Sequence, residues 1–443
     1  MNGFAKLLVT SAALGAAALS PARAELDVIE LKAAIETSVE GDYPKLDALY
    51  KDIHAHPEVA FQEVKTAARL AAEMRALGFE VTEKIGKTGL VAIYTNGDGP
   101  TIMVRTELDA LPMEEKTGLA YASHDRTNWN GQDTFVAHSC GHDIHMASWV
   151  GTVKTLLGLK DQWHGTLMFI AQPAEESTSG AKAMLADGAF TRFKKPDFGF
   201  ALHDGPFAYG TITYRVGAGS SNSDGLRITF RGRGGHGAAP QKTIDPVMIA
   251  ARFIVDLQSV ISREKDPTEF GVVSIGAIDG GTAENIIPDD VLLRGTIRSF
   301  KPEVRANILA GIERTANAAA AMSGAPAPDM KITEGGKAVM NDPAVVETAA
   351  KVLKVAFGDK FTTSPPMTAS EDFSEFIDAG VPSMFFSIGV YEPERVAAAN
   401  NGTGPQLPPN HSPQFAPVPK PTITTGIEAM TLAVLSAFDA HRQ

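Results

Sequence analysis

Cysteine is nearly absent from the sequence, because Cys140 is the single one among 443 residues. One thiol cannot form an internal disulfide, which excludes the disulfide-stapled scaffolds typical of small secreted proteins. A lone thiol is usually either buried and inert or engaged in chemistry such as metal binding. Cys140 is therefore a candidate functional residue.

Positive charge is also in short supply. Lys and Arg total 40 residues against 52 Asp and Glu, which gives a net charge of −12 and an isoelectric point near 5.4. A nucleic-acid surface needs clustered Lys and Arg to replace condensed counterions, and the sequence has no basic stripe. We therefore expect no nucleic-acid partner.

Long apolar runs are missing beyond the N-terminus. There, Lys6 precedes the apolar run 7–19, and the sequence Ala22-Arg23-Ala24 follows it. This order is typical of a secretory signal peptide with a small-x-small cleavage site, and the run is too short to span a bilayer. We expect residues 1–24 to be removed, leaving a periplasmic or secreted protein without a membrane segment.

A chain of this length exceeds what one hydrophobic core usually serves, so two domains are expected. In the N-terminal half, segments with strand and helix periodicity alternate, which predicts an α/β sheet with helices on both faces and functional groups at strand ends. The expected strands are 89–95, 101–105, 165–171 and 198–202, and the expected helices are 30–38, 43–50, 65–77, 144–157 and 180–187.

The pattern changes at the flexible stretch 217–220, which is suited to a hinge. Beyond it the order is β-α-β-β-α-β, which is the ferredoxin-like arrangement. Its expected strands are 225–231, 268–277, 290–299 and 329–333, and its expected helices are 245–264 and 301–323. We predict an inserted dimerisation or lid domain at 218–334, and a first domain formed by 25–217 plus 335–443.

The placement of histidine is the most informative feature of the sequence. The segment HSCGHDIHM at 138–146 brings His138, Cys140, His142, Asp143 and His145 together just before a predicted helix. Thiolate and imidazole are good ligands for zinc-like divalent metals, and carboxylates complete such sites. Because so many polar groups are costly to leave unpaired in a core, metal binding is favoured over a structural role.

A pair of adjacent acids follows the predicted strand 165–171. Neighbouring residues on extended backbone point in opposite directions, so Glu175 and Glu176 can hold different roles, one as a metal ligand and one as a general base. Adjacent acids are more often a solvated face, but their position at a strand end beside Pro173 favours function. His203, after an apolar run, and His411, in a Pro-rich loop, carry little information alone.

Together these pieces resemble the amidohydrolase branch of peptidase family M20, which includes hippurate hydrolase, plant indole-acetyl-amino-acid hydrolases and bacterial N-acyl-amino-acid amidohydrolases. The resemblance extends through nearly the whole mature chain. The matching segments are HAHPEVAFQE at 54–63, RTELDALP at 105–112, HSCGHDIH at 138–145, QPAEE at 172–176, ALHDGP at 201–206, GGHGAAPQKTIDP at 234–246, AENIIPD at 283–289, GTIRSF at 295–300, SEDF at 370–373 and NHSP at 410–413.

The resemblance implies a mixed-sheet α/β catalytic domain of the dinuclear metallopeptidase type, with the inserted ferredoxin-like domain. It also implies two divalent metal ions, with Mn or Zn expected and Co or Ni left open. The ligands carried over from the family are Cys140, His142, Glu176, His203 and His411.

The catalytic and substrate-binding roles are likewise implied by the resemblance. Glu175 matches the general base that later acts as the acid. His236 matches a residue of the inserted domain that helps to bind the oxyanion across a dimer. Asn285 and Arg298 match positions near the substrate carboxylate.

The predicted function is hydrolysis of the amide bond of N-acyl amino acids or related small conjugates by a metal-activated water. A metallo-carboxypeptidase or dipeptidase acting on short peptides is an alternative. A Cys140 nucleophile with His142 as its base is disfavoured, because no separate orienting residue is evident. A non-catalytic two-domain binding protein is a third hypothesis. The sequence leaves open the substrate, the metal, and whether the chain forms a homodimer.

Three departures from the family pattern are visible. Glu107 stands where the family usually has Asp, and Ile144 where it usually has Gly. Asp204-Gly205 replaces the usual Val-Trp after His203. The last two changes lie beside predicted ligands, so we expect them to affect the substrate pocket.

Overall fold

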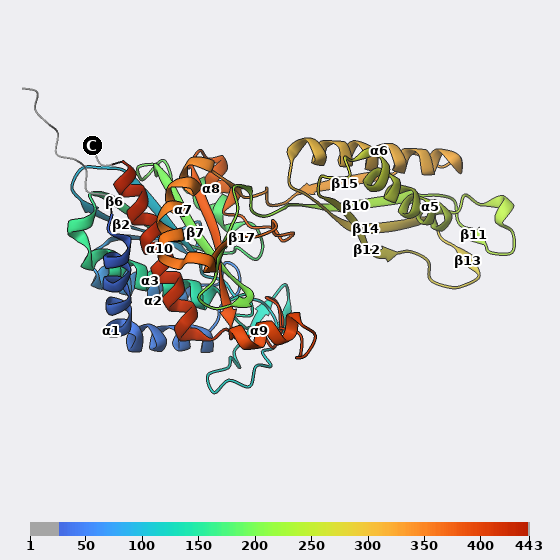
Figure 1. Cartoon of the computed structure of the whole chain (residues 1–443). Helices are drawn as coiled ribbons and strands as arrows, with labels where there is room; N and C mark the ends of the chain where they lie inside the picture. Colours follow the sequence, from blue (N-terminus) through green and yellow to red (C-terminus); the bar gives the residue numbers. More distant parts are fainter. Residues whose placement is uncertain (1–25, 442–443) are drawn as a thin grey trace, which may run out of the picture.

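The computed structural model describes residues 26–441, so the predicted signal peptide lies outside the described residues. An eight-stranded mixed sheet, ordered β1-β2-β6-β3-β7-β18-β8-β17, forms the centre of the first domain (Figure 1). The four central strands β6, β3, β7 and β18 run parallel to one another. The strands are β1 (Glu80–Ile85), β2 (Gly89–Asn96), β3 (Thr101–Glu107), β6 (Gly165–Gln172), β7 (Phe198–Ala208), β8 (Ile212–Tyr214), β17 (Phe361–Thr363) and β18 (Ser383–Tyr391).

Helices cover both faces of this sheet, as predicted. In the fully buried strand β3, Ile102 and Val104 face one core while Met103 faces the other, because side chains alternate along a strand. One face carries α1 (Val28–Ala55), α2 (Val64–Ala76), α3 (His142–Gly158), α7 (Pro343–Phe357) and α10 (Pro419–Ala440), and the other carries α4 (Gly180–Ala186) and α8 (Ser374–Asp378). The α/β architecture expected from the alternation of strands and helices is confirmed.

The prediction of two separate helices near the N-terminus was wrong. Residues 28–55 form the single helix α1, with Pro44 inside it. Proline removes one helical hydrogen bond, which usually ends a helix. Here the apolar side chains Ile35 and Val39 before Pro44, and Leu46 and Leu49 after it, pack into the same core. This continuous packing outweighs the loss of one hydrogen bond.

The C-terminal helix α10 was not predicted. Within residues 26–441 it is the one helix long and apolar enough to cross a membrane, by length and composition alone, contrary to our expectation of none. Of its most apolar window, 83% is buried inside the fold, where α10 packs against α1, α3 and α7. Such burial is typical of a core helix.

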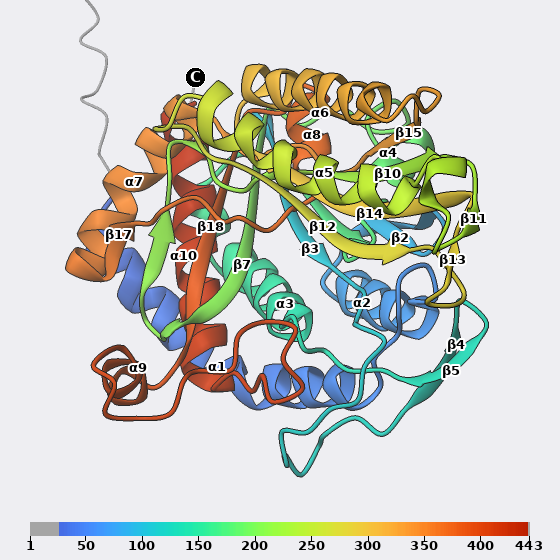
Figure 2. The ribbon, with the colours of Figure 1, turned by 90° about the vertical axis from the view of Figure 1, so that its right-hand side faces the viewer.

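A second sheet of four antiparallel strands lies in the middle of the chain, in the order β12-β14-β10-β15 (Figure 2). Helices α5 (Pro246–Ser259) and α6 (Pro302–Met322) pack on one face through a core that includes Ile228, Phe253 and Ile308. The strands are β10 (Asn222–Arg231), β12 (Gly271–Asp279), β14 (Asp290–Ser299) and β15 (Asp329–Glu334). The observed order β-α-β-β-α-β is the predicted one, while the domain limits at 218 and 334 stay a prediction.

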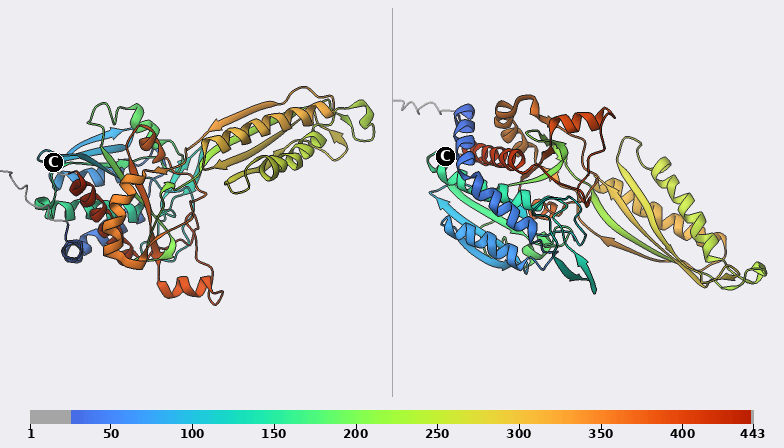
Figure 3. Two further views of the ribbon diagram at one scale, coloured as in Figure 1. Left: turned by 45° about the horizontal axis from the view of Figure 1, so that its top comes forward. Right: turned by 90° about the horizontal axis from the view of Figure 1, so that it is seen from below.

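The part of the chain that forms this second sheet and its two helices projects away from the first domain (Figures 1 and 3). The chain crosses between the two parts twice, and the crossings lie side by side, because β9 (Gly217–Ala218) pairs with β16 (Met340–Asn341). At the far end of the projection, β11 (Gly235–His236) pairs with β13 (Ile286–Ile287). These two antiparallel segments form a short hinge that joins the parts.

Candidate metal centre

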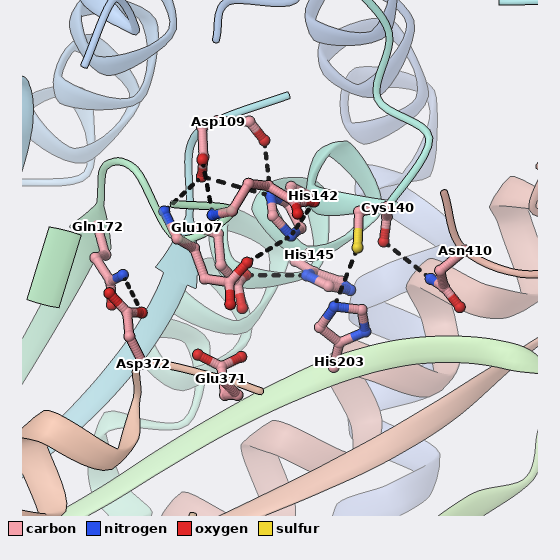
Figure 4. A network of polar contacts seen from close by, with 12 residues as sticks. Glu107, Asp109, Cys140, His142, His145, Gln172, His203, Glu371, Asp372 and Asn410 are labelled. Atoms are coloured by element: carbon pink, nitrogen blue, oxygen red, sulfur yellow. Dashed lines mark hydrogen bonds and ion pairs between the residues drawn. The ribbon is translucent and has the colours of Figure 1, made fainter. Parts of the chain in front are cut away.

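The carboxyl ends of β3 and β6 meet at one edge of the central sheet, because the two strands are parallel neighbours. Asp109 follows β3, and Glu175 and Glu176 follow β6. Helix α3 begins at the same edge with His142, directly after Gly141 in the left-handed conformation (φ 83°). Figure 4 shows side chains from these elements directed toward one another.

Buried carboxylates fix the loop that carries the two glutamates. Asp109 accepts the backbone N–H groups of Glu175 and Glu176, each at 3.0 Å. Glu63 accepts the N–H of Ala174 at 2.8 Å. Ala174 has φ 52°, a conformation that costs energy for a residue with a Cβ and occurs where the surroundings enforce it. The loop is therefore held in one shape before any ligand binds.

All five predicted metal ligands lie together in the structure. The Cys140 Sγ is 3.5 Å from His203 Nε2, and His142 Nε2 is 4.0 Å from Glu176 Oε1. His411 Nε2 is 3.3 Å from the other oxygen of Glu176. Ligand atoms in the set Cys140, His142, His203 and in the set Cys140, Glu176, His411 all lie within 4.8 Å of one another.

Two of the histidines are oriented by backbone carbonyls. Nδ1 of His142 lies 2.7 Å from the carbonyl oxygen of Asp109, and Nδ1 of His203 lies 2.7 Å from that of Asp204. A carbonyl can only accept, so each ring donates its Nδ1–H to the carbonyl and turns Nε2 toward the cluster. Nε2 of His142 and Oε1 of Glu176 are buried, and neither has a hydrogen-bond partner among the described residues. Unpaired nitrogen and oxygen atoms that converge with a sulfur fit divalent metal ions.

Burial and neighbouring carboxylates govern the protonation of the site. Burial, followed by the charges of Glu371 and Glu176, raises the pKa of Glu175 well above its ordinary value. Burial also raises the pKa of the Cys140 thiol, and the charge of Glu176 adds to this effect. Bound cations would act in the opposite direction on both groups.

Glu176 is shifted the other way. Burial disfavours its charged form, but the hydrogen bond from His411 and the charge of that ring outweigh burial, so the pKa of Glu176 is lowered. Burial lowers the pKa of His142 to about 3. Glu176 is thus held as a carboxylate and His142 as a neutral imidazole, which are the forms that bind metals.

A network of buried ion pairs around Arg105 lies beside the cluster of expected metal ligands. The Arg105 guanidinium donates to Glu107, to Glu371 at 2.8 Å and to Asp372 at 3.3 Å. Glu107 in turn lies 2.9 Å from Nδ1 of His145. No role was predicted from the sequence for Arg105, Glu371 or Asp372. Charged residues inside the otherwise apolar segment 101–107 are the signal that could have identified them.

His203 was predicted to end its strand, and this was wrong. Strand β7 continues to Ala208, because it pairs in register with β18 past Gly205. His203 therefore lies in the middle of a strand, yet its side chain still reaches Cys140.

Of the three residues predicted in the inserted domain, one lies at the site. Arg298 lines a cavity of about 700 Å³ together with Cys140, Glu175, His203 and His411. Its Nη1 is buried and has no hydrogen-bond partner among the described residues. Arg298 occupies the end of β14 next to the hinge, opposite Ser223.

His236 and Asn285 lie elsewhere. Both are exposed, at the paired segments β11 and β13 at the far end of the projection (Figure 1). The carbonyl oxygen of Asn285 accepts the N–H of Gly237, which keeps the two residues together. Within one chain in this arrangement, neither residue reaches the metal cluster.

Comparison with known proteins agrees with this geometry. The model of peptidase family M20/M25/M40 matches residues 103–403, about two thirds of the chain. The chain belongs to this family. Hippurate hydrolase from Campylobacter jejuni is 37% identical over 348 residues, which cover 77% of this chain and 86% of that protein. Thermostable carboxypeptidase 2 from Saccharolobus solfataricus is 32% identical over 370 residues, which cover 82% and 88%.

A solved M20 structure shows the same fold. It is a dinuclear metal-binding peptidase from Bacillus subtilis, with a TM-score of 0.73 and 27% identity, covering 92% of this chain and 99% of that one. The fold class and the family resemblance predicted from sequence are therefore confirmed. The chain is a metal-dependent amide hydrolase, and the non-catalytic hypothesis loses its support.

Proposed function

We propose that this enzyme hydrolyses the amide bond of N-acyl amino acids or related small conjugates with two divalent metal ions. The observation that carries this proposal is that Cys140, Glu176, His203 and His411 line one cavity beside Glu175. His142 joins the same cluster of ligand atoms. The similarity to hippurate hydrolase supports this substrate class. We expect Mn or Zn as the metal: a thiolate with three imidazoles suits Zn, and the family resemblance adds Mn.

Glu175 is the proton carrier of the proposed reaction. Its carboxylate lies 3.8 Å from His142 Nε2 and lines the cavity without belonging to the expected ligand set. When bound, the ions would act as Lewis acids and make water a competent nucleophile at neutral pH. Glu175 takes a proton from the attacking water and later delivers it to the departing amine, which would otherwise be too poor a leaving group.

Arg298 is placed to bind the carboxylate of the amino-acid part. Its buried, unpaired Nη1 faces the same cavity as Glu175. A guanidinium can hold a carboxylate through two parallel hydrogen bonds, which would orient the scissile amide toward Glu175. Asn285 is proposed to contribute to the same subsite when a second copy or a closed arrangement brings it near.

His236 is proposed to stabilise the oxyanion from a second copy of the chain. It lies exposed at the distal end of the projection, where a partner's active site can reach it without any change within its own chain. A closing motion about the hinge formed by β9 and β16 is the alternative explanation of how His236 reaches an active site. Both would bring a donor to the developing negative charge.

The nucleophilic-cysteine hypothesis is disfavoured by the structure. Among the described residues, the imidazole in hydrogen-bond contact with Cys140 belongs to His203 rather than to His142. Burial also keeps the thiol protonated, so it is a poor nucleophile without a metal. Export through the N-terminal segment to the periplasm or outside the cell remains part of our proposal.

The testing experiment is an assay of chelated protein with Mn, Zn, Co or Ni added back, against N-benzoyl and N-acetyl amino acids and dipeptides. We expect no turnover after chelation, recovery with Mn or Zn, and faster cleavage of acylated amino acids than of dipeptides. Preferred cleavage of dipeptides would favour a peptidase, in line with the carboxypeptidase relative. Full turnover in verified metal-free protein would reject the proposal.

A further inference from the structure

Asp204 occupies a central place beside the metal centre that its family resemblance does not explain. It is 3% exposed and follows the expected ligand His203. Its backbone orients two imidazoles, because its N–H donates to His145 Nε2 at 2.8 Å and its carbonyl accepts from His203 Nδ1 at 2.7 Å. Any residue can supply these two backbone contacts, so they do not account for an aspartate here.

The side chain of Asp204 makes a different contact. Its Oδ1 accepts a hydrogen bond of 2.8 Å from Nδ2 of Asn410, and the same amide lies 3.1 Å from the carbonyl oxygen of Cys140. Figure 4 shows Asn410 reaching toward the Cys140 backbone. The other carboxylate oxygen is buried without a hydrogen-bond partner among the described residues, and a Cβ at Gly141 would overlap it. The carboxylate therefore fits against Gly141 and turns toward Asn410.

Asn410 immediately precedes His411, the expected ligand with the least support from its surroundings. The side chain of His411 is 55% exposed, and its φ of 68° is unfavourable for a residue with a Cβ. Its backbone N–H donates to the carbonyl oxygen of Ser139 at 2.7 Å. The loop that carries His411 thus meets the rest of the centre through the Ser139 and Asn410 contacts.

We propose that Asp204 and Asn410 form a clamp that positions His411 for metal binding. Asp204 lies on strand β7 next to His203, and Asn410 lies on the loop next to His411. The Asn410 amide donates both to the Asp204 carboxylate and to the Cys140 carbonyl. The clamp therefore ties together the three segments that supply these ligands. In this role Asp204 and Asn410 act through the expected ligands, so they are positioning residues.

The proposal predicts the metal affinity of defined variants. Residues that orient metal ligands typically change affinity by about 10- to 100-fold when they are removed. Asn410→Ala and Asp204→Val each break the clamp, and each should weaken Zn²⁺ or Mn²⁺ binding within that range. Asp204→Asn keeps a carbonyl oxygen that can accept from Asn410, so its affinity should remain closer to that of the wild type.

The pair should act as one unit and through His411. Asp204→Val combined with Asn410→Ala should bind metal no more weakly than the weaker single variant. In a His411→Ala background, Asn410→Ala should have no further effect on affinity. Additive losses, or an equal loss in the absence of His411, would overturn the clamp.

Affinity is measured by competition between metal-free, full-length protein and a fluorescent chelator for Zn²⁺ and Mn²⁺. The Tm of the metal-free protein is measured alongside. Asn341→Ala is a matched control, because the Asn341 amide likewise donates to two acceptors, the carbonyl oxygens of Arg215 and Phe385, but lies outside the metal centre. It should lower the Tm without changing affinity. Unchanged affinity in Asn410→Ala rejects the clamp alone, whereas absent metal binding in the wild type rejects the proposed function as well.

Discussion

The two parts of the molecule that carry predicted functional residues differ in how far the fold already positions those side chains. In the first domain, the expected ligand side chains other than His411 are largely buried, and backbone carbonyls orient His142 and His203. The ion network around Arg105 lies beside them. In the projecting part, His236 and Asn285 are exposed and lie at the paired segments β11 and β13, far from the metal centre. The first domain therefore contains a preorganised site, and the second offers groups that become useful only against another surface.

This difference follows from the cost of burial. Charged and polar groups can be removed from water only when partners satisfy them, so a metal site must be built in place by the fold. A residue that serves another chain, or a closed state, must stay accessible until that contact forms. Arg298 lies between these cases, because it is near the hinge and lines the cavity.

The largest effect expected from the first domain is that of Glu175→Gln. The variant retains the side-chain size but cannot accept the proton of water, so kcat should fall by about 100- to 10,000-fold. Because Glu175 is outside the expected ligand set, metal content should stay at the wild-type value. Steady-state kinetics and elemental analysis of one preparation check both points, and unchanged kcat would remove Glu175 from the chemistry.

His236→Ala tests the second region directly. Loss of an oxyanion donor should lower kcat by about 100- to 1000-fold while leaving metal content unchanged. Mixing this variant with Glu175→Gln then separates the two explanations. If His236 acts across a dimer, random re-pairing restores one working site in each mixed dimer, or about a quarter of wild-type activity. If the hinge closes within one chain, no activity returns.

Arg298→Ala is expected to affect binding more than chemistry. Losing a charged hydrogen bond to the substrate carboxylate should raise KM by about 10- to 100-fold for acids. The matched control is a substrate whose carboxylate is replaced by a carboxamide, for which wild type and variant should differ little. An equal change for both substrates would show that Arg298 does not read the carboxylate.

The smallest expected effect is a change of the unfolding free energy with pH, which depends on the buried His54. His54 lies between Asp143 (2.6 Å) and Glu115 (3.1 Å); burial opposes its charge, but the two carboxylates outweigh burial and raise its pKa to about 10. A group whose pKa is raised by folding stabilises fully below its unfolded pKa, and this contribution disappears as pH rises through the folded value. Chelated protein should therefore lose up to a few kcal/mol of unfolding free energy between pH about 6.5 and about 10.

Urea unfolding at several pH values measures this loss. His54→Gln should be less stable at pH 6 and should show a much flatter pH dependence. His56→Gln is the control, because the His56 side chain is 64% exposed. Identical slopes for His54→Gln and the wild type would contradict the assigned role of the buried pair.

The sequence predicted most strands and helices up to residue 334, because their periodicity and their Gly and Pro boundaries are local features. The expected ligand set came from the resemblance to peptidase family M20, because His203 and His411 carry little information alone; the structure places the five side chains together. It missed the roles of Arg105, Glu371 and Asn410, whose contacts join segments separated by more than 200 residues. Nothing in a local pattern indicates that Arg105 meets Glu371 or that Asn410 meets Asp204.

Local patterns also failed where packing decides the outcome. The strand predicted at 198–202 continues to Ala208, because pairing with β18 keeps the chain extended. The helices predicted at 30–38 and 43–50 form the single helix α1, because both halves pack into the same core.

The central claim is that five side chains of the first domain hold two divalent ions beside Glu175. Its most direct test is the metal content of chelated protein refilled with Zn²⁺ or Mn²⁺ and then dialysed, for the wild type and for Cys140→Ala, with CD spectra to verify folding. The account predicts two ions per wild-type chain and the loss of at least one in the variant. A folded wild-type protein that retains no ion, or a Cys140→Ala variant that retains two with unchanged affinity, would contradict it.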